Sequence, residues 1–243
     1  MGRDILTLPA PDADERLAYG DDANQFVDFR WSRLPGVRPM VVHFHGGFWR
    51  SRFDLQHAGN FCAALTQAGF HTANVEYRRV GQPGGGWPGT LEDALSAARF
   101  ACARAEAPVV VTGHSAGGHL ALWLSAEMPE LAGVAVMGPV ACLRLGWERN
   151  LGDGAVRDFL GGGPEEAPER YAAADPAVRE SHVPRVLIHG TRDEVVPVEI
   201  SRAYCEARGG CLVELEGADH FDVVDPRSAW WNEVVARSTE RLL

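Results

Sequence analysis

The strongest constraint on the fold is an apolar run that leads into a glycine-bounded turn. The run from Pro108 to Thr112 reads PVVVT, and Gly113-His114-Ser115-Ala116-Gly117 follows it, after which the pattern is helical through Glu127. A fully apolar run of β-branched residues is typical of a strand covered on both faces, as in the centre of a parallel sheet. The sequence therefore predicts a strand, a tight turn and a helix in succession.

Strand and helix patterns alternate along the rest of the chain. Strands are expected at 40–44, 71–77, 131–137, 185–189 and 212–215, and helices at 54–68, 90–104, 155–160, 168–174, 198–208 and 226–243. This alternation predicts an α/β fold, with a mostly parallel central sheet and helices on both faces. We expect one domain over residues 1–243, with the Gly-, Pro- and charge-rich segment 141–183 as a cap or lid over one edge of the sheet.

Charge and cysteine usage restrict the class of protein. The chain has 23 basic residues, all arginine, against 33 acidic residues, which gives a formal charge of −10. Nucleic-acid binding needs clustered basic side chains, and a membrane span needs about 20 apolar residues; neither pattern occurs. No signal-peptide pattern opens the chain, and the five cysteines are scattered without a C-x-x-C pair. We expect a cytoplasmic protein with a small-molecule substrate and neither nucleic-acid nor membrane partners; whether it forms a homodimer stays open.

The turn after the apolar run carries the chemistry. G-x-S-x-G between a strand and a helix is a nucleophile elbow, which presents the Ser115 hydroxyl above the sheet; a plain glycine-lined turn is the alternative interpretation. A serine nucleophile needs a base and a group that orients the base. Of nine histidines, only His220 falls in the loop between the last strand and the terminal helix, so it is the predicted base. Asp193, after strand 185–189, is the predicted acid, with Glu194 as its rival.

A second loop is suited to stabilising an oxyanion. One donor is the backbone N–H of Ala116, directly after the nucleophile, and the others are expected from Gly46 and Gly47, after strand 40–44. Phe48 and Trp49 follow these glycines. Together with Trp87 they are predicted to line an aromatic substrate pocket, although each also fits a place in the core.

Two further histidines lie on the first predicted strand. His43 and His45 alternate with apolar residues and so share one face of the strand. Local spacing places no acid or third histidine beside them, so a structural role is favoured over metal binding. We expect no metal and no cofactor.

With these motifs the chain resembles the α/β-hydrolase superfamily over nearly its whole length. Within it, the chain is most similar to the kynurenine formamidase (arylformamidase) group and the neighbouring hormone-sensitive-lipase-like esterases. The segments that carry this resemblance are Tyr19-Gly20 before an Asp28-containing strand, His45-Gly46-Gly47-Phe48-Trp49-Arg50, Glu76-Tyr77-Arg78, Gly113 to Leu120 and Asp219-His220-Phe221.

The resemblance implies a serine hydrolase that removes a formyl or short acyl group from an arylformamide such as N-formylkynurenine, or from an ester. A general short-chain carboxylesterase is the alternative, and a catalytically silent binding protein on the same fold is a third hypothesis. A Rossmann oxidoreductase is excluded because no G-x-G-x-x-G follows the first strands.

Overall fold

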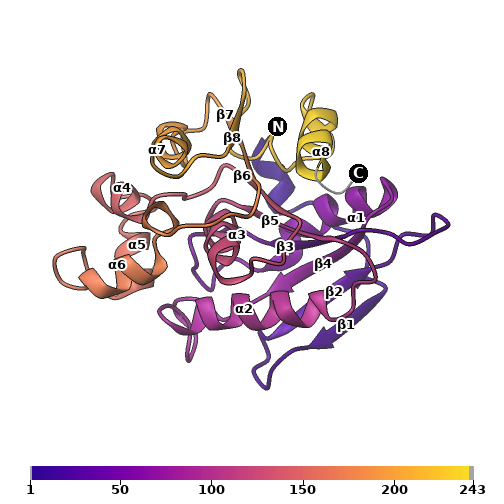
Figure 1. Cartoon of the computed structure of the whole chain (residues 1–243), viewed down its shortest axis with the longest axis horizontal. Helices are drawn as coiled ribbons and strands as arrows, with labels where there is room; N and C mark the ends of the chain where they lie inside the picture. Colours follow the sequence, from indigo (N-terminus) through magenta and orange to yellow (C-terminus); the bar gives the residue numbers. More distant parts are fainter. Residues whose placement is uncertain (1, 241–243) are drawn as a thin grey trace.

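The computed structural model describes residues 2–240, which form an eight-stranded sheet with helices on both faces (Figure 1). Met1 and residues 241–243, the end of the predicted terminal helix, lie outside the described residues. The strand order is β1-β2-β4-β3-β5-β6-β7-β8, in which β1 and β2 run antiparallel to their neighbours and all other pairs are parallel. The strands are β1 (Glu15–Ala18), β2 (Phe26–Arg30), β3 (Met40–Phe44), β4 (His71–Glu76), β5 (Val109–His114), β6 (Gly133–Met137), β7 (Arg185–Gly190) and β8 (Cys211–Leu215).

Helices connect the parallel strands. They are α1 (Gly59–Gln67), α2 (Gly89–Cys102), α3 (Ala116–Glu127), α4 (Leu143–Glu148), α5 (Ala155–Leu160), α6 (Pro168–Ala174), α7 (Glu199–Arg208) and α8 (Trp231–Thr239), with short 3-10 turns η1 (Gly2–Leu6), η2 (Leu55–Ala58) and η3 (Pro176–Val178). The expected α/β fold with a mostly parallel sheet is confirmed.

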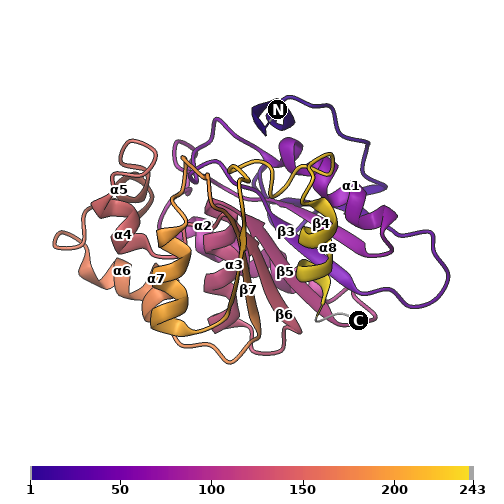
Figure 2. The ribbon, with the colours of Figure 1, turned by 90° about the horizontal axis from the view of Figure 1, so that it is seen from above.

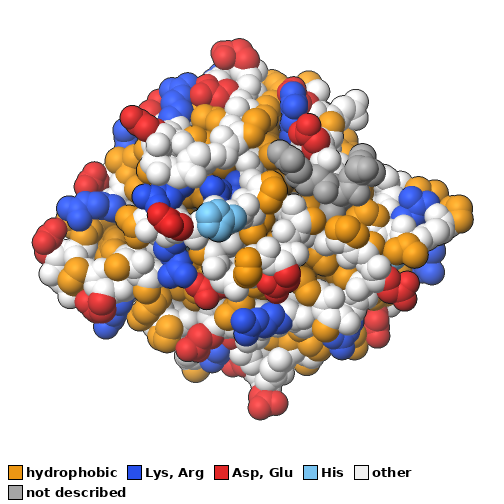
Figure 3. Space-filling view, in the orientation of Figure 1, with side chains coloured by type: hydrophobic (Ala, Val, Ile, Leu, Met, Phe, Trp, Pro, Cys, Tyr) orange, Lys and Arg blue, Asp and Glu red, His pale blue; other side chains and the backbone are white. Residues whose placement is uncertain are grey.

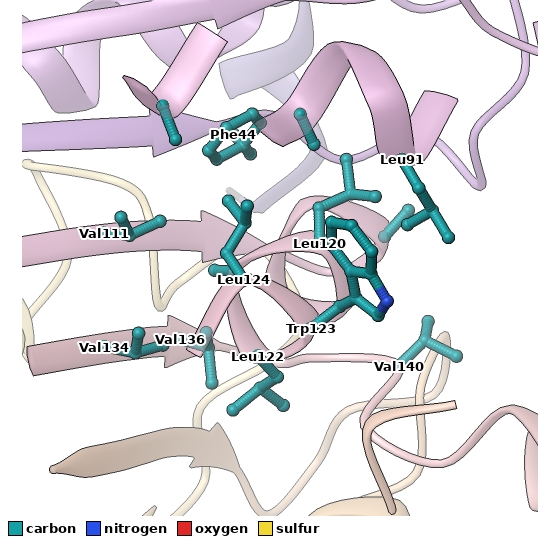
Figure 4. Packing of buried hydrophobic residues seen from close by; sticks show 14 of the residues in the cluster. Phe44, Leu91, Val111, Leu120, Leu122, Trp123, Leu124, Val134, Val136 and Val140 are labelled. Atoms are coloured by element: carbon teal, nitrogen blue, oxygen red, sulfur yellow. The ribbon is translucent and has the colours of Figure 1, made fainter. Parts of the chain in front are cut away.

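The sheet separates two hydrophobic clusters. Successive residues of a strand point to opposite faces, and on β3 Val41 packs with α1 and α8 while Val42 and Phe44 pack with α2 and α3. Figure 2 shows α1 and α8 on one side of the strands and α2, α3 and α7 on the other. Helix α3 lies against β3, β5 and β6, and its Leu120 and Leu124 point toward these strands (Figure 4). The helix that begins at the predicted elbow is therefore anchored at the centre of the fold.

The segment that connects β6 to β7 in the sequence forms three short helices, α4 to α6. They lie together at one end of the molecule (Figures 1 and 2). The predicted bounds of α5 and α6 agree with the structure, whereas α4 was not predicted. The edge strand β1 was also missed, because its four residues are mostly exposed and have no apolar alternation.

Two further observations concern the described residues as a whole. None of their helices is long and apolar enough to cross a membrane. On the face shown in Figure 3, acidic and basic side chains are interspersed.

Candidate active site

Ser115 occupies a strained turn between β5 and α3. Its backbone has φ 55° and ψ −117°, a conformation that residues other than glycine rarely adopt. The Ser115 N–H donates to the Met137 carbonyl oxygen at 2.9 Å, and the Val140 N–H donates to the Ser115 carbonyl oxygen at 3.1 Å. A Cβ at Gly117 would lie 2.0 Å from the carbonyl oxygen of Phe44, so this close approach requires glycine. Backbone strain held by such neighbours is typical of functional sites.

The side chains of Asp193 and His220 form a buried pair. His220 Nδ1 lies 2.6 Å from Asp193 Oδ2, and His189 Nε2 lies 3.2 Å from the same oxygen. Asp193 Oδ1 accepts the backbone N–H groups of Val195 and Val196 at 2.9 and 2.8 Å. Burial raises the pKa of Asp193, but the hydrogen bonds from His189 and His220 outweigh it and hold the pKa below its ordinary value. Because a carboxylate only accepts, His220 carries its proton on Nδ1, and its Nε2 is left as an acceptor.

This geometry separates the two rival acids. Glu194 is exposed, whereas Asp193 is 8% exposed and points to His220. Asp193 is therefore the carboxylate placed to orient the imidazole.

His114, the variable residue of the elbow, holds the loop that carries His220. Its Nε2 lies 2.8 Å from the His220 carbonyl oxygen, and the two rings are 4.5 Å apart between centroids. Burial lowers the pKa of His114 well below its ordinary value, so it is a neutral hydrogen-bond donor through Nε2. It links the nucleophile turn directly to the base loop.

The loop after β3 lies against the elbow. Gly46 is buried, and a Cβ there would lie 3.1 Å from Ser115 Cβ. Gly47 has φ +114° and lines the same cavity as Ser115. Ala116 is the first residue of α3, where the backbone N–H has no partner within the helix. No backbone acceptor is found for the N–H of Gly47 or Ala116 within residues 2–240. These groups are free to donate to an oxyanion.

A buried polar network holds the loop after β3, which contains Gly46 and Gly47. His45 Nε2 lies 3.1 Å from Glu76 Oε1, and the Tyr77 hydroxyl donates to the His45 carbonyl oxygen at 2.8 Å. Glu76 also accepts the Leu55 N–H at 3.1 Å and pairs with Arg79 at 3.1 Å. Burial raises the pKa of Glu76, but His45 and Arg79 outweigh it and keep the pKa below its ordinary value. The predicted structural role of His45 is therefore specific: it ties the glycine loop to β4.

Ser115 and His220 line one cavity of about 280 Å³ at the carboxyl ends of the parallel strands. Ligands of open α/β sheets bind at this end. No cluster of three or more possible metal ligands is found among the described side chains. The lining is largely apolar and aromatic, and consists of Leu6, Gly47, Phe48, Arg52, Phe53, His57, His114, Ser115, Val195, His220 and Phe221.

Comparison with known proteins identifies the relatives of this chain. The family model named BD-FAE matches residues 33–133, and the model of the prolyl oligopeptidase family matches residues 85–207, about half of the chain. The chain belongs to the prolyl oligopeptidase family, within the α/β-hydrolase superfamily. The expected superfamily is thereby confirmed.

Three proteins that are similar to this chain are esterases. Esterase LipC of Mycobacterium tuberculosis is 30% identical, over 86% of this chain and 60% of that protein. The versiconal hemiacetal acetate esterase of Aspergillus parasiticus is 31% identical, over 54% of this chain and 44% of that protein. The chain thus spans about half of the length of these curated relatives. The native structure of esterase Est2 from the planctomycete Thermogutta terrifontis is similar with a TM-score of 0.73 at 25% identity, covering 95% of this chain and 91% of Est2.

Two of the three predicted pocket aromatics are not where the sequence placed them. Phe48 lines the cavity, but Trp49 is fully buried and stacks on Phe159 of α5 at 4.6 Å between centroids. Trp87 is absent from the cavity lining and packs against the main core, and its backbone N–H donates to the Phe159 carbonyl oxygen at 2.9 Å. The pocket assignment of Trp49 and Trp87 was wrong, because Trp49 stacks on Phe159 of α5 and Trp87 packs against the core.

Several residues of the site were not predicted. Leu6 reaches the cavity from the N-terminal turn η1, and Phe53 and His57 reach it from the loop after β3 and from η2. The contact of His189 with Asp193 was also not predicted: its Nε2 donates to the Val196 carbonyl oxygen at 2.8 Å and lies 3.2 Å from Asp193 Oδ2. One available signal was spacing, because His189 precedes Asp193 by four residues across the turn after β7.

Proposed function

We propose that this protein is a serine hydrolase that cleaves short-chain carboxylic esters. One observation carries the proposal: a strained serine and an aspartate-paired histidine line the same small cavity, beside backbone N–H groups that lack acceptors. The esterase relatives support the same chemistry.

In the proposed mechanism Ser115 is the nucleophile. His220 Nε2 removes the hydroxyl proton while Ser115 Oγ attacks the ester carbonyl carbon, and Asp193 stabilises the imidazolium that forms. The N–H groups of Ala116 and the Gly46-Gly47 loop donate to the tetrahedral oxyanion. Collapse breaks the bond to the alcohol, which takes the proton from His220. Water, deprotonated by His220, then attacks the acyl carbon; collapse breaks the bond to Ser115 Oγ, which takes the proton back from His220, and the acid is released.

The proposed substrates are small. The cavity volume of about 280 Å³ is slightly below the 300 to 1,000 Å³ range of sites for drug-sized ligands. Est2, at 24% identity in these forms, has been solved with propionate and with butyrate bound. We expect kcat/KM to be highest for acetyl or propionyl esters and to fall by hexanoyl in a p-nitrophenyl ester series. A steady rise through hexanoyl would contradict a closed acyl site, since each buried methylene contributes about 0.8 kcal/mol where space allows.

Arylformamides are a second proposed substrate class. A formyl group has only hydrogen on its carbonyl carbon, and the three phenylalanines of the cavity suit an aryl leaving group. Hydrolysis of N-formylkynurenine at a rate comparable with that of p-nitrophenyl acetate is the expected result. If the enzyme cleaves esters but not formamides, the arylformamide proposal is refuted and the carboxylesterase function stands.

Active-site labelling tests the proposed reaction class. A fluorophosphonate is expected to label the wild-type protein and not the Ser115→Ala variant, and both hydrolysis and labelling depend on the same hydroxyl. A folded wild-type protein that is neither labelled nor active would favour the silent binding protein.

We also propose a supporting role for residues 141–183 as a cap. Arg50 of the glycine loop pairs with Asp158 of α5 at 2.7 Å, and the Phe48 ring lies against Gly152. The cap would thus position the loop that holds the oxyanion.

A cytoplasmic location is proposed from the five cysteines, all of which are free thiols.

A further inference from the structure

The cavity beside Ser115 contains one arginine that lacks a countercharge. Arg52 is exposed and lines the cavity, and no aspartate or glutamate is among the lining residues. Its guanidinium carbon lies 5.0 Å from the centre of the Phe53 ring. Within the described part of the chain, no carboxylate pairs with Arg52. The side chain is therefore held at the cavity by an aromatic contact while its hydrogen-bond donors remain available.

Neighbouring arginines differ in this respect. Arg50, two residues earlier, pairs with Asp158 at 2.7 Å and donates to the Asp153 carbonyl oxygen at 2.9 Å. Arg79, on the loop after β4, pairs with Glu76 at 3.1 Å. Arg52 is the arginine of the cavity lining, and it differs from these two neighbours in having no carboxylate partner within the described residues.

The histidines that line the cavity do not duplicate this charge. Burial, followed by the proximity of His45, lowers the pKa of His57 to about 3, and burial lowers that of His114. Both are neutral at pH 7, and His220 is paired with Asp193. Because the formal charge of the chain is −10, its long-range field disfavours anions. A local positive group at the cavity mouth opposes that field where a substrate enters.

We propose that Arg52 binds a carboxylate of the substrate, so that the preferred substrates are aromatic or apolar esters that carry a free carboxylate. This inference rests on the proposed esterase function. The planar guanidinium can donate two parallel hydrogen bonds to a carboxylate, and Phe48, Phe53 and Phe221 contact the apolar part of the same molecule.

Matched ester pairs test the inference. 4-Acetoxybenzoate carries a carboxylate on its leaving group, and 4-acetoxybenzamide is a neutral substrate of the same shape. The measured quantity is the ratio of kcat/KM for the anionic ester to that for the neutral ester. Arg52→Gln is expected to lower this ratio about three- to tenfold, in the range of an exposed charge-assisted hydrogen bond. Arg52→Lys keeps the positive charge but cannot donate two parallel hydrogen bonds, so its ratio is expected to lie between that of the wild type and that of Arg52→Gln.

A second pair places the carboxylate on the acyl side. p-Nitrophenyl hemisuccinate ends in a carboxylate where p-nitrophenyl butyrate ends in a methyl group. The pair whose kcat/KM ratio changes in Arg52→Gln identifies the side of the ester that carries the recognised carboxylate. Arg104→Gln is the matched control: this exposed arginine also lies over a phenylalanine, 3.6 Å from the Phe100 ring, but it is absent from the cavity lining. Its ratios are expected to equal those of the wild type.

Two results would overturn the inference, and they are distinguishable. Active wild-type enzyme with the same ratios in Arg52→Gln, for both pairs, refutes the role of Arg52 and leaves the esterase function standing. A folded wild-type protein that cleaves none of the four esters refutes the esterase function together with the inference. Salt gives a further readout: raising ionic strength from about 0.05 to 0.5 M is expected to reduce the wild-type preference and to leave that of Arg52→Gln unchanged.

Discussion

Replacing Asp193 by asparagine is expected to invert the hydrogen bonding of His220. Oδ1 faces the two backbone N–H groups of Val195 and Val196, which an amide satisfies only with its oxygen. The amide nitrogen must then occupy the position of Oδ2, 2.6 Å from His220 Nδ1. Since that nitrogen donates, Nδ1 becomes an acceptor and the proton moves to Nε2. His220 can then no longer accept the proton of Ser115.

The expected loss follows from this change of tautomer. An asparagine at the equivalent role in serine proteases costs about 10⁴-fold in kcat, which corresponds to about 5 kcal/mol of transition-state stabilisation. Steady-state hydrolysis of p-nitrophenyl acetate measures the loss, and nitrogen NMR of the histidine ring reports the tautomer. Thermal unfolding of each variant verifies that the fold is retained.

The matched control is Glu194→Gln, one residue along the same turn and exposed. Its kcat is expected to stay within about twofold of the wild type, as for most surface substitutions. A folded Asp193→Asn variant that loses less than about 100-fold in kcat would refute the tautomer argument, as would an equal loss in Glu194→Gln.

Three further predictions concern the nucleophile, the core and acid stability. Ser115→Ala is expected to lose about 10⁴- to 10⁶-fold in kcat for p-nitrophenyl acetate while unfolding at a similar temperature, and near-wild-type turnover would remove Ser115 from the mechanism. Trp49→Ala is expected to lower the free energy of unfolding in urea by about 3 to 5 kcal/mol, because the ring is fully buried against Phe159, whereas Phe48→Ala is expected mainly to raise KM; the reverse pattern would return Trp49 to the pocket. The pKa of Asp193 is lower in the folded protein than its ordinary value of about 3.9, so ionised Asp193 stabilises the fold above that pH, and this stability is lost as pH falls toward the folded pKa. The difference in unfolding free energy between wild type and Asp193→Asn should therefore shrink from about pH 5 to pH 3, and a constant difference would show that the carboxylate charge contributes nothing.

The sequence by itself determined the layout of the chemistry. The valine side chains of β5 point to both faces of the sheet, so the strand is stable only where both faces are buried. The glycines that follow permit the close turn at Ser115. Chain order then left one histidine after the last strand and one acidic pair after the strand before it. These signals come from short segments and from their order along the chain, and they predicted the fold class, Ser115, His220 and an acid in the turn after β7.

Tertiary structure decided which neighbouring side chain faces the site. Asp193 and Glu194 are adjacent, and the sequence kept Glu194 as a rival of the predicted Asp193; the geometry that separates them depends on the position of His220, 27 residues after Asp193. Phe48 and Trp49 are adjacent, yet Phe48 lines the cavity and Trp49 is fully buried, because Phe159 of a distant helix provides the surface on which Trp49 stacks. Leu6 reaches the cavity from the other end of the chain. Such contacts join residues far apart in sequence, and they arise from packing and charge pairing that no local pattern encodes.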